Sequence, residues 1–142
     1  MSYLPTDALV GDPEPWEQPF WDFCAQRSLR FQTCADCGVV RHPPMPFCGA
    51  CNSPHHLWKP PGEDAELFTF TIVRHASHAS LAPAVPYNAA VVMFPGTQSV
   101  RLVSNIVNCA NEDLRIGMKL SLVWEAAGGG RIVPRFEPAS RS

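Results

Sequence analysis

The chain has 142 residues, of which 46% are hydrophobic and 17% are charged, and its formal net charge is −2. This length and composition allow one modest hydrophobic core with a small appendage. Nucleic-acid binding through phosphates needs an excess of basic residues, and here Lys59 and Lys119 are the only lysines. No apolar stretch approaches the length of a membrane span, so we expect a soluble protein that binds neither nucleic acid nor membrane.

The first part of the chain predicts an arm and a short helix. Residues 1–13 lack periodicity and are expected to be extended, whereas apolar residues recur at helical spacing over residues 17–27, with Pro19 acceptable in the first turn. The aromatic side chains exceed what docking on a small domain requires, so we predict that they form a partner interface. The alternative is that these aromatic side chains only cover the chain's own hydrophobic core. These side chains are Trp16, Phe20, Trp21 and Phe23.

Four cysteines then form two C-x2-C pairs, which are typical of a tetrahedral thiolate site for structural zinc. The residue after each pair, Gly38 or Asn52, is of a type that tolerates the positive φ that such a turn demands. The predicted metal ligands are Cys34, Cys37, Cys48 and Cys51.

Other interpretations of the cysteines are weaker. The first nine residues offer neither a basic start nor an apolar run, so we expect no signal peptide and a reducing, cytoplasmic location in which disulfides are disfavoured. Four thiolates leave no open position for catalytic water, although spacing alone does not separate zinc from iron. We expect three nearby histidines to lie on the surface: His42, His55 and His56. The alternative is that one of them replaces a cysteine sulfur as a metal ligand. Cys24 and Cys109 are expected to be buried apolar residues.

The second half of the chain is β in character. Alternating or continuous apolar runs predict five strands, and glycine turns separate several of them. A short helix or turn at residues 112–117 falls between the third and fourth strands, as in a Greek-key barrel of the OB type. The predicted fold is therefore mainly β, with an N-terminal helix, a rubredoxin-like zinc ribbon and a five-stranded OB-fold barrel. The strands are predicted at residues 66–73, 88–94, 99–107, 118–125 and 131–136.

This order of parts resembles a zinc-ribbon and OB-fold family long catalogued as a domain of unknown function. The motifs that carry the resemblance span most of the chain, from Phe20 to Pro138, and suggest domains at residues 1–28, 29–60 and 61–142. They are the stretch 30–38 around the first cysteine pair, Pro43-Pro44, the second pair with Gly49-Ala50, Phe68-Thr69-Phe70-Thr71, Pro86-Tyr87, Ile116-Gly117-Met118 and Phe136-Glu137-Pro138.

The resemblance implies an accessory subunit of acyl-CoA metabolism, in lipid or aromatic acid catabolism. Family members sit beside thiolases, thiolase-like aldolases or enoyl-CoA hydratases, in a hetero-oligomer where they help to form the partner's CoA-thioester site. We therefore expect a chain that is not an enzyme on its own, with structural zinc and no catalytic residues. A nucleic-acid-binding zinc-ribbon and OB module is the alternative.

The loop between the first two barrel strands is the candidate contact for CoA or for the partner. In OB folds this loop helps to line the ligand face, and its cationic side chains suit a phosphate or a carboxylate. A mobile polar loop with incidental histidines is the alternative. The candidate residues are Arg74, His75 and His78.

Overall fold

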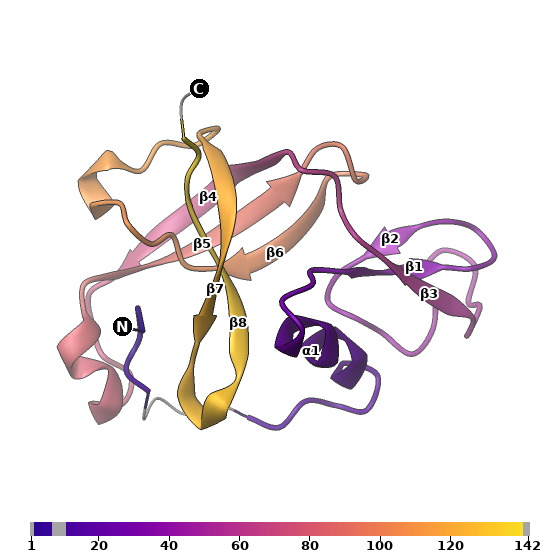
Figure 1. Cartoon of the computed structure of the whole chain (residues 1–142), viewed down its shortest axis with the longest axis horizontal. Coiled ribbons are helices and arrows are strands. Elements are labelled where there is room, and N and C mark those ends of the chain that lie inside the picture. Colours follow the sequence, from indigo (N-terminus) through magenta and orange to yellow (C-terminus); the bar gives the residue numbers. More distant parts are fainter. Residues whose placement is uncertain (1, 7–10, 141–142) are drawn as a thin grey trace.

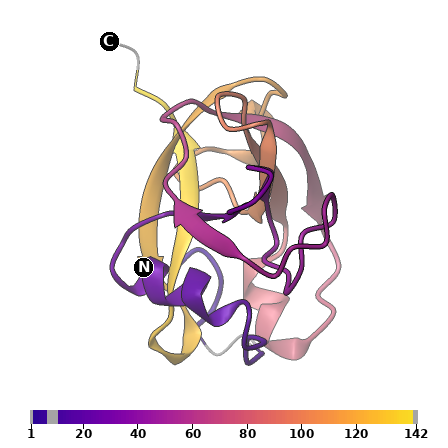
Figure 2. The ribbon, with the colours of Figure 1, turned by 90° about the vertical axis from the view of Figure 1, so that its right-hand side faces the viewer.

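The computed structural model describes residues 2–6 and 11–140 (Figure 1). The chain passes from helix α1 (Gln18–Ala25) through a small three-stranded sheet into a larger five-stranded sheet. The small sheet and the helix lie on one side of the larger sheet, which curls strongly (Figures 1 and 2). The predicted mainly β fold is confirmed. Of the described helices, none has the length and apolar character needed to cross a membrane.

Helix α1 is short and amphipathic, as its sequence predicts. Proline in the first turn fits because its missing N–H would have no partner inside the helix there. Phe20 and Cys24, one turn apart, are buried on the same face. The helix ends before Arg27, whose φ of 54° is left-handed. It is therefore two residues shorter than predicted at its C-terminal end.

The small sheet, called the ribbon (residues 31–59), has the strand order β2-β1-β3 and is antiparallel. Strand β1 (Phe31–Cys34) is buried along its whole length between β2 (Val40–Arg41) and β3 (His56–Lys59). The sequence predicts a strand over residues 29–33, which corresponds to β1, but it predicts neither β2 nor β3.

The larger sheet, called the barrel (residues 65–138), has the strand order β6-β5-β4-β7-β8, with neighbouring strands antiparallel. Side chains of β6 alternate between buried and exposed, as the sequence predicts for a strand with one face on the core. Its strands are β4 (Ala65–Val73), β5 (Tyr87–Phe94), β6 (Val100–Ser104), β7 (Lys119–Ala126) and β8 (Ile132–Pro138).

The two outer strands of the barrel meet and close it. A parallel bridge joins Ile106 to Phe136, and the N–H of Val107 donates to the carbonyl of Phe136 at 2.8 Å. Pro134 has no N–H to donate to a neighbouring strand, but its carbonyl accepts a hydrogen bond from the Ser104 hydroxyl at 2.7 Å. This closure of the third strand on the fifth gives the OB-like topology.

One hydrophobic core runs through all three parts of the chain. Phe31 of the ribbon packs against Phe94 of the barrel, with ring centroids 5.3 Å apart, and Phe94 packs on Phe136 at 6.0 Å. The core therefore crosses the domain boundaries proposed at residues 28/29 and 60/61. Its buried members are Phe20, Cys24, Leu29, Phe31, Ala65, Leu67, Ala90, Val92, Phe94, Val100, Leu102, Ile106, Leu114, Leu120 and Phe136.

Two polar contacts fix other segments to the barrel. The Gln98 side chain reaches the ribbon, accepting from the N–H of Val40 and donating to the carbonyl of Gly38, each at 3.0 Å. The Tyr3 hydroxyl accepts from the backbone N–H and the side-chain amide of buried Asn88 at 2.9 and 2.8 Å. The arm predicted at residues 1–13 thus touches the barrel at Tyr3, whereas residues 1 and 7–10 lie outside the described part.

Candidate functional site

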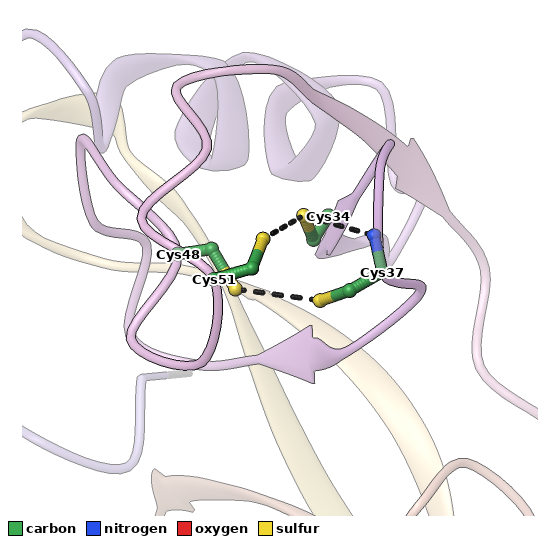
Figure 3. Close-up of side chains that lie close together, drawn as sticks. All are labelled: Cys34, Cys37, Cys48 and Cys51. Carbon is green, nitrogen blue, oxygen red and sulfur yellow. Dashed lines mark hydrogen bonds between the residues drawn. The ribbon is translucent and has the colours of Figure 1, made fainter.

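The four predicted metal ligands converge at one end of the ribbon (Figure 3). Their sulfur atoms all lie within 4.8 Å of one another, and the Cys34–Cys51 and Cys37–Cys48 sulfur pairs are each 3.6 Å apart. Cys34 and Cys48 are buried, while Cys37 and Cys51 are exposed. Each C-x2-C turn, called a knuckle here, therefore contributes one buried (inner) sulfur and one exposed (outer) sulfur.

The two knuckles have the same backbone design. The N–H of Gly38 donates to the carbonyl of Cys34 at 3.0 Å, and the N–H of Asn52 donates to that of Cys48 at 2.8 Å. Gly38 and Asn52 have φ values of 78° and 62°, so the predicted left-handed residues are confirmed. Because these turns are closed by backbone bonds, the sulfur positions do not depend on flexible side chains alone.

Backbone N–H groups also point at the inner sulfurs. The N–H groups of Cys37 and Ala50 lie 3.4 Å from the sulfurs of Cys34 and Cys48, respectively. The N–H of Cys37 is the main cause that lowers the pKa of Cys34 to about 6. For Cys48 the N–H of Cys51 is the first cause of a lowered pKa, followed by that of Ala50. Both effects favour the thiolate, which is the form that ligates metal.

The donor set fits zinc. A tetrahedral zinc ion with Zn–S bonds of about 2.3 Å separates its sulfurs by about 3.8 Å, close to the observed pairs. Four thiolates also complete the coordination sphere, as in structural zinc sites. The clustered cysteines therefore support a structural metal that cross-links the two knuckles.

The histidines near the cysteines are outside this cluster. His55 and His56 are exposed, in agreement with the prediction of surface positions. His42 departs from that prediction in part, because it is half-buried. Its ring lies 4.9 Å from that of Phe20 and 5.4 Å from that of Phe31, and burial lowers its pKa to about 4, an effect that Glu17 partly offsets.

The aromatic residues predicted for a partner interface lie in different environments. Phe20 is 3% exposed and belongs to the chain's own core. Trp21 and Phe23 are half-buried, with Arg131 over the first ring and Arg30 over the second. Phe23 also faces Trp58 of β3, with ring centroids 5.8 Å apart. Trp16 is the most open of the set, at 38% exposure.

The candidate CoA loop lies on the surface. Arg74, His75 and His78 are all exposed. The Nδ1 atom of His78 accepts from the backbone N–H of Ser80 at 3.1 Å and thereby caps a 3₁₀ helix, Ala79–Ala84. His78 therefore has a local structural role, and sequence reasoning did not anticipate the helix.

Sequence reasoning also missed several exposed apolar side chains. Met45 and Phe47 precede the second cysteine pair and are 50% and 58% exposed. The three prolines around them gave no sign of this exposure, because prolines near a turn do not say which side chains face solvent. Besides these two and Trp16, the exposed large apolar side chains of the described residues are Leu57, Phe68, Val103 and Ile116.

Two family models match consecutive parts of the chain. The rubredoxin-like zinc ribbon domain of ChsH2 matches residues 21–54, and the C-terminal OB-fold domain of ChsH2 matches residues 58–125. The first includes the four cysteines, and the second includes the larger part of the barrel.

A curated relative and two solved structures are also similar. A "Probable enoyl-CoA hydratase alpha subunit" from Thermomonospora curvata is 32% identical over 124 residues, which are 87% of this chain but only 38% of that protein. A chain of the structure titled "Ltp2-ChsH2(DUF35) aldolase" is 29% identical, with a TM-score of 0.81, and the match covers 92% of this chain and all of that one.

A DUF35-family protein of unknown function from Sulfolobus solfataricus shares the fold. It has 17% identity and a TM-score of 0.61, over 94% of this chain and 90% of the other.

Proposed function

Because the chain belongs to the ChsH2 family of zinc-ribbon and OB-fold proteins, we propose that it is a non-catalytic subunit of an enzyme complex that acts on acyl-CoA thioesters. Its partner would be a thiolase-like or aldolase-like protein or, alternatively, an enoyl-CoA hydratase. The complex would serve lipid or aromatic acid catabolism.

The main support is the match over the whole length of a chain from the Ltp2-ChsH2(DUF35) aldolase. That aldolase is named for two components, Ltp2 and ChsH2(DUF35). The Thermomonospora curvata relative is named as one subunit of a hydratase, which also fits a chain that works with others. Since this chain spans 38% of that relative, the hydratase activity itself is not transferred.

The proposed division of labour follows from the chain's own groups. Four thiolates around a metal leave no position for a substrate or a water. His42, the histidine most removed from solvent, is enclosed by aromatic rings and held neutral. We therefore assign the nucleophile and the acid and base to the partner. This chain would stabilise the partner and complete the wall of its thioester site.

The loop with Arg74 and His75 is the proposed contact for CoA. Both side chains are exposed, and a guanidinium suits a phosphate through bidentate hydrogen bonds. For the partner interface we propose Trp16, with Trp21 and Phe23 at its margin, extended by Met45 and Phe47 of the ribbon. Exposed aromatic and methionine side chains are enriched at protein interfaces.

The nucleic-acid alternative has less support. Three arginines lie over aromatic rings of this chain, and Lys119 pairs with Glu66 at 3.0 Å. Together with the net charge of −2, this leaves few cationic side chains to bind the phosphates of a nucleic-acid backbone.

Co-expression with a thiolase-like or aldolase-like protein encoded beside this chain tests the proposal. We expect a zinc-containing hetero-oligomer on size-exclusion chromatography, and a partner whose turnover depends on the chain. Phe47→Ala should weaken the complex by about tenfold or more, whereas Ile116→Ala, at a similarly exposed site, should leave it unchanged. Arg74→Ala should raise the KM for the thioester while the complex stays intact. A stable monomer that binds an oligonucleotide at physiological salt would overturn the proposal.

A further inference from the structure

A cavity of about 460 Å³ lies where the barrel closes, between α1, ribbon residues 42–44 and the facing edges of β6 and β8. We call it the seam cavity. Strands β6 and β8 are joined near Ser104 and Ile106, but within the described chain no backbone hydrogen bond joins residues 100–103 to β8. Helix α1 covers this gap. The cavity is lined by Glu17, Phe20, Trp21, His42, Pro43, Pro44, Arg101, Leu102, Val103, Val133, Pro134 and Arg135.

The walls of the seam cavity are mostly apolar and stiff. Trp21 and Phe20 form one side, with ring centroids 5.1 Å apart, and their rings are nearly perpendicular. The other apolar side chains of the lining are three prolines, one leucine and two valines: Pro43, Pro44, Pro134, Leu102, Val103 and Val133. A rigid apolar cleft of a few hundred Å³ with few polar groups is the usual form of a small-molecule site.

Among the polar side chains of the lining, His42 is the one that is neutral at pH 7, in contrast to Glu17, Arg101 and Arg135. Its ring lies against Phe20 and Phe31, with its Nδ1 atom buried, while Nε2 is not among the buried atoms that lack a hydrogen-bond partner. Nε2 is therefore the ring nitrogen that a ligand would reach. Because the ring is neutral at pH 7, it carries both a donor and an acceptor nitrogen.

The charges around the seam cavity balance. The Nε atom of Arg135 donates to Glu125 at 2.8 Å, and both side chains are largely buried. Arg101 lies over the Phe68 ring at 3.9 Å, and the lining also contains one carboxylate of opposite charge, that of Glu17. The lining therefore favours neither an anion nor a cation.

We propose that the seam cavity binds a small, uncharged aromatic or alicyclic molecule that carries one hydroxyl or carbonyl group. The ring of the ligand would pack on Trp21 and the prolines, and its polar group would bond to His42. The site is separate from the cysteine cluster, and it does not depend on the proposed function because this chain alone supplies every wall.

Three probes of similar shape test this with the zinc-loaded full chain: benzyl alcohol, toluene and benzoate. NMR titration would follow the Trp21 indole and the ring nitrogens of His42. We expect benzyl alcohol to bind about fivefold more tightly than toluene, the effect of one neutral hydrogen bond. Benzoate should bind more weakly than benzyl alcohol, because no unbalanced cation compensates its desolvation.

Two variants locate the binding. His42→Phe keeps an aromatic ring between Phe20 and Phe31 but removes both nitrogens, so the preference for benzyl alcohol over toluene should disappear. Val103→Trp should fill the mouth of the cavity and reduce binding of both probes by tenfold or more. Ile116→Trp is the matched control, since Val103 is 71% and Ile116 69% exposed but only Val103 lines the cavity.

Several results would overturn the proposal. These are equal affinities for benzyl alcohol and toluene, tighter binding of benzoate, no binding of any probe, or equal loss in the two tryptophan variants. Retention of the alcohol preference in His42→Phe would also exclude the assigned role of His42.

Discussion

The ribbon and the barrel are stabilised in different ways. The ribbon strands have two to four residues, and its two turns are brought together by four cysteine sulfurs. The barrel strands have five to nine residues and enclose a core of aliphatic and aromatic side chains. We therefore expect a metal cross-link to stabilise the backbone of the ribbon, whereas burial of apolar side chains stabilises that of the barrel.

The two regions are nevertheless not independent. Phe31 is on a ribbon strand, yet its side chain is fully buried and packs against Phe94 of the barrel. The difference between the regions thus concerns what fixes each backbone, while the core is shared. Four experiments separate these contributions, from the largest expected effect to the smallest.

Removal of the metal should produce the largest difference. Structural zinc contributes on the order of 10 kcal/mol to the folding of small zinc domains. We expect about one zinc per chain, and chelation or Cys34→Ala should abolish amide protection in the ribbon while β4 and β5 stay protected in hydrogen exchange. Cys24→Ala is the matched control, because Cys24 is a buried cysteine outside the cluster. Loss of both regions in one transition would show that the barrel depends on the metal as well.

Phe136→Ala should destabilise the barrel, whereas removal of the metal should destabilise the ribbon. Its ring is fully buried against Phe94, so truncation should cost about 3–5 kcal/mol in urea unfolding. Below the transition the variant should keep its zinc. The exposed substitution Val103→Ala should change the free energy of unfolding by less than about 0.5 kcal/mol. Zinc loss from folded Phe136→Ala would contradict the separation of the two regions.

His42→Phe should alter how stability depends on pH. The pKa of His42 falls from 6.5 to about 4 on folding, so the unfolded chain binds a proton first as the pH falls. Stability from this group is present above pH 6.5 and is lost as the pH falls toward 4. Between pH 7 and pH 5 the wild type should lose about 2 kcal/mol more than the variant. Urea titrations at both pH values measure it, and equal losses would contradict the burial of His42.

Gln98→Ala should have the smallest effect. It removes two hydrogen bonds between the barrel and the ribbon backbone at an exposed site, at a cost of about 1 kcal/mol. Hydrogen exchange at the Val40 amide should become faster. Gln98→Glu keeps the acceptor for that amide and should protect it better than alanine does. Equal exchange in the wild type and both variants would mean that Gln98 does not hold the ribbon.

The barrel strands were predictable because each carries its own signal. Alternation in β6 and the continuous apolar run in β5 depend on local sequence, and both strands occur close to the predicted positions. Strand β3 carries no such signal. Its four residues become a strand because they pair with β1, for example Leu57 with Thr33, and this partner is more than twenty residues away.

The same distinction applies to the candidate site. Cysteine spacing and the two turn residues that follow the pairs are local, and they predicted the converging sulfurs. The environment of His42 is made by Phe20 of α1 and Phe31 of β1, which the sequence places on separate elements. No local pattern reveals that a histidine next to a metal turn will instead lie between two aromatic rings.

The contact of Gln98 with the ribbon has a consequence for variation of the chain. Its amide recognises only main-chain atoms, the carbonyl of Gly38 and the N–H of Val40. Residue identity at the recognised positions therefore does not enter the contact, beyond the backbone conformation that it must permit. The side chains at positions 38 and 40 could therefore vary without loss of this contact, provided that the first knuckle keeps its turn and proline does not replace Val40.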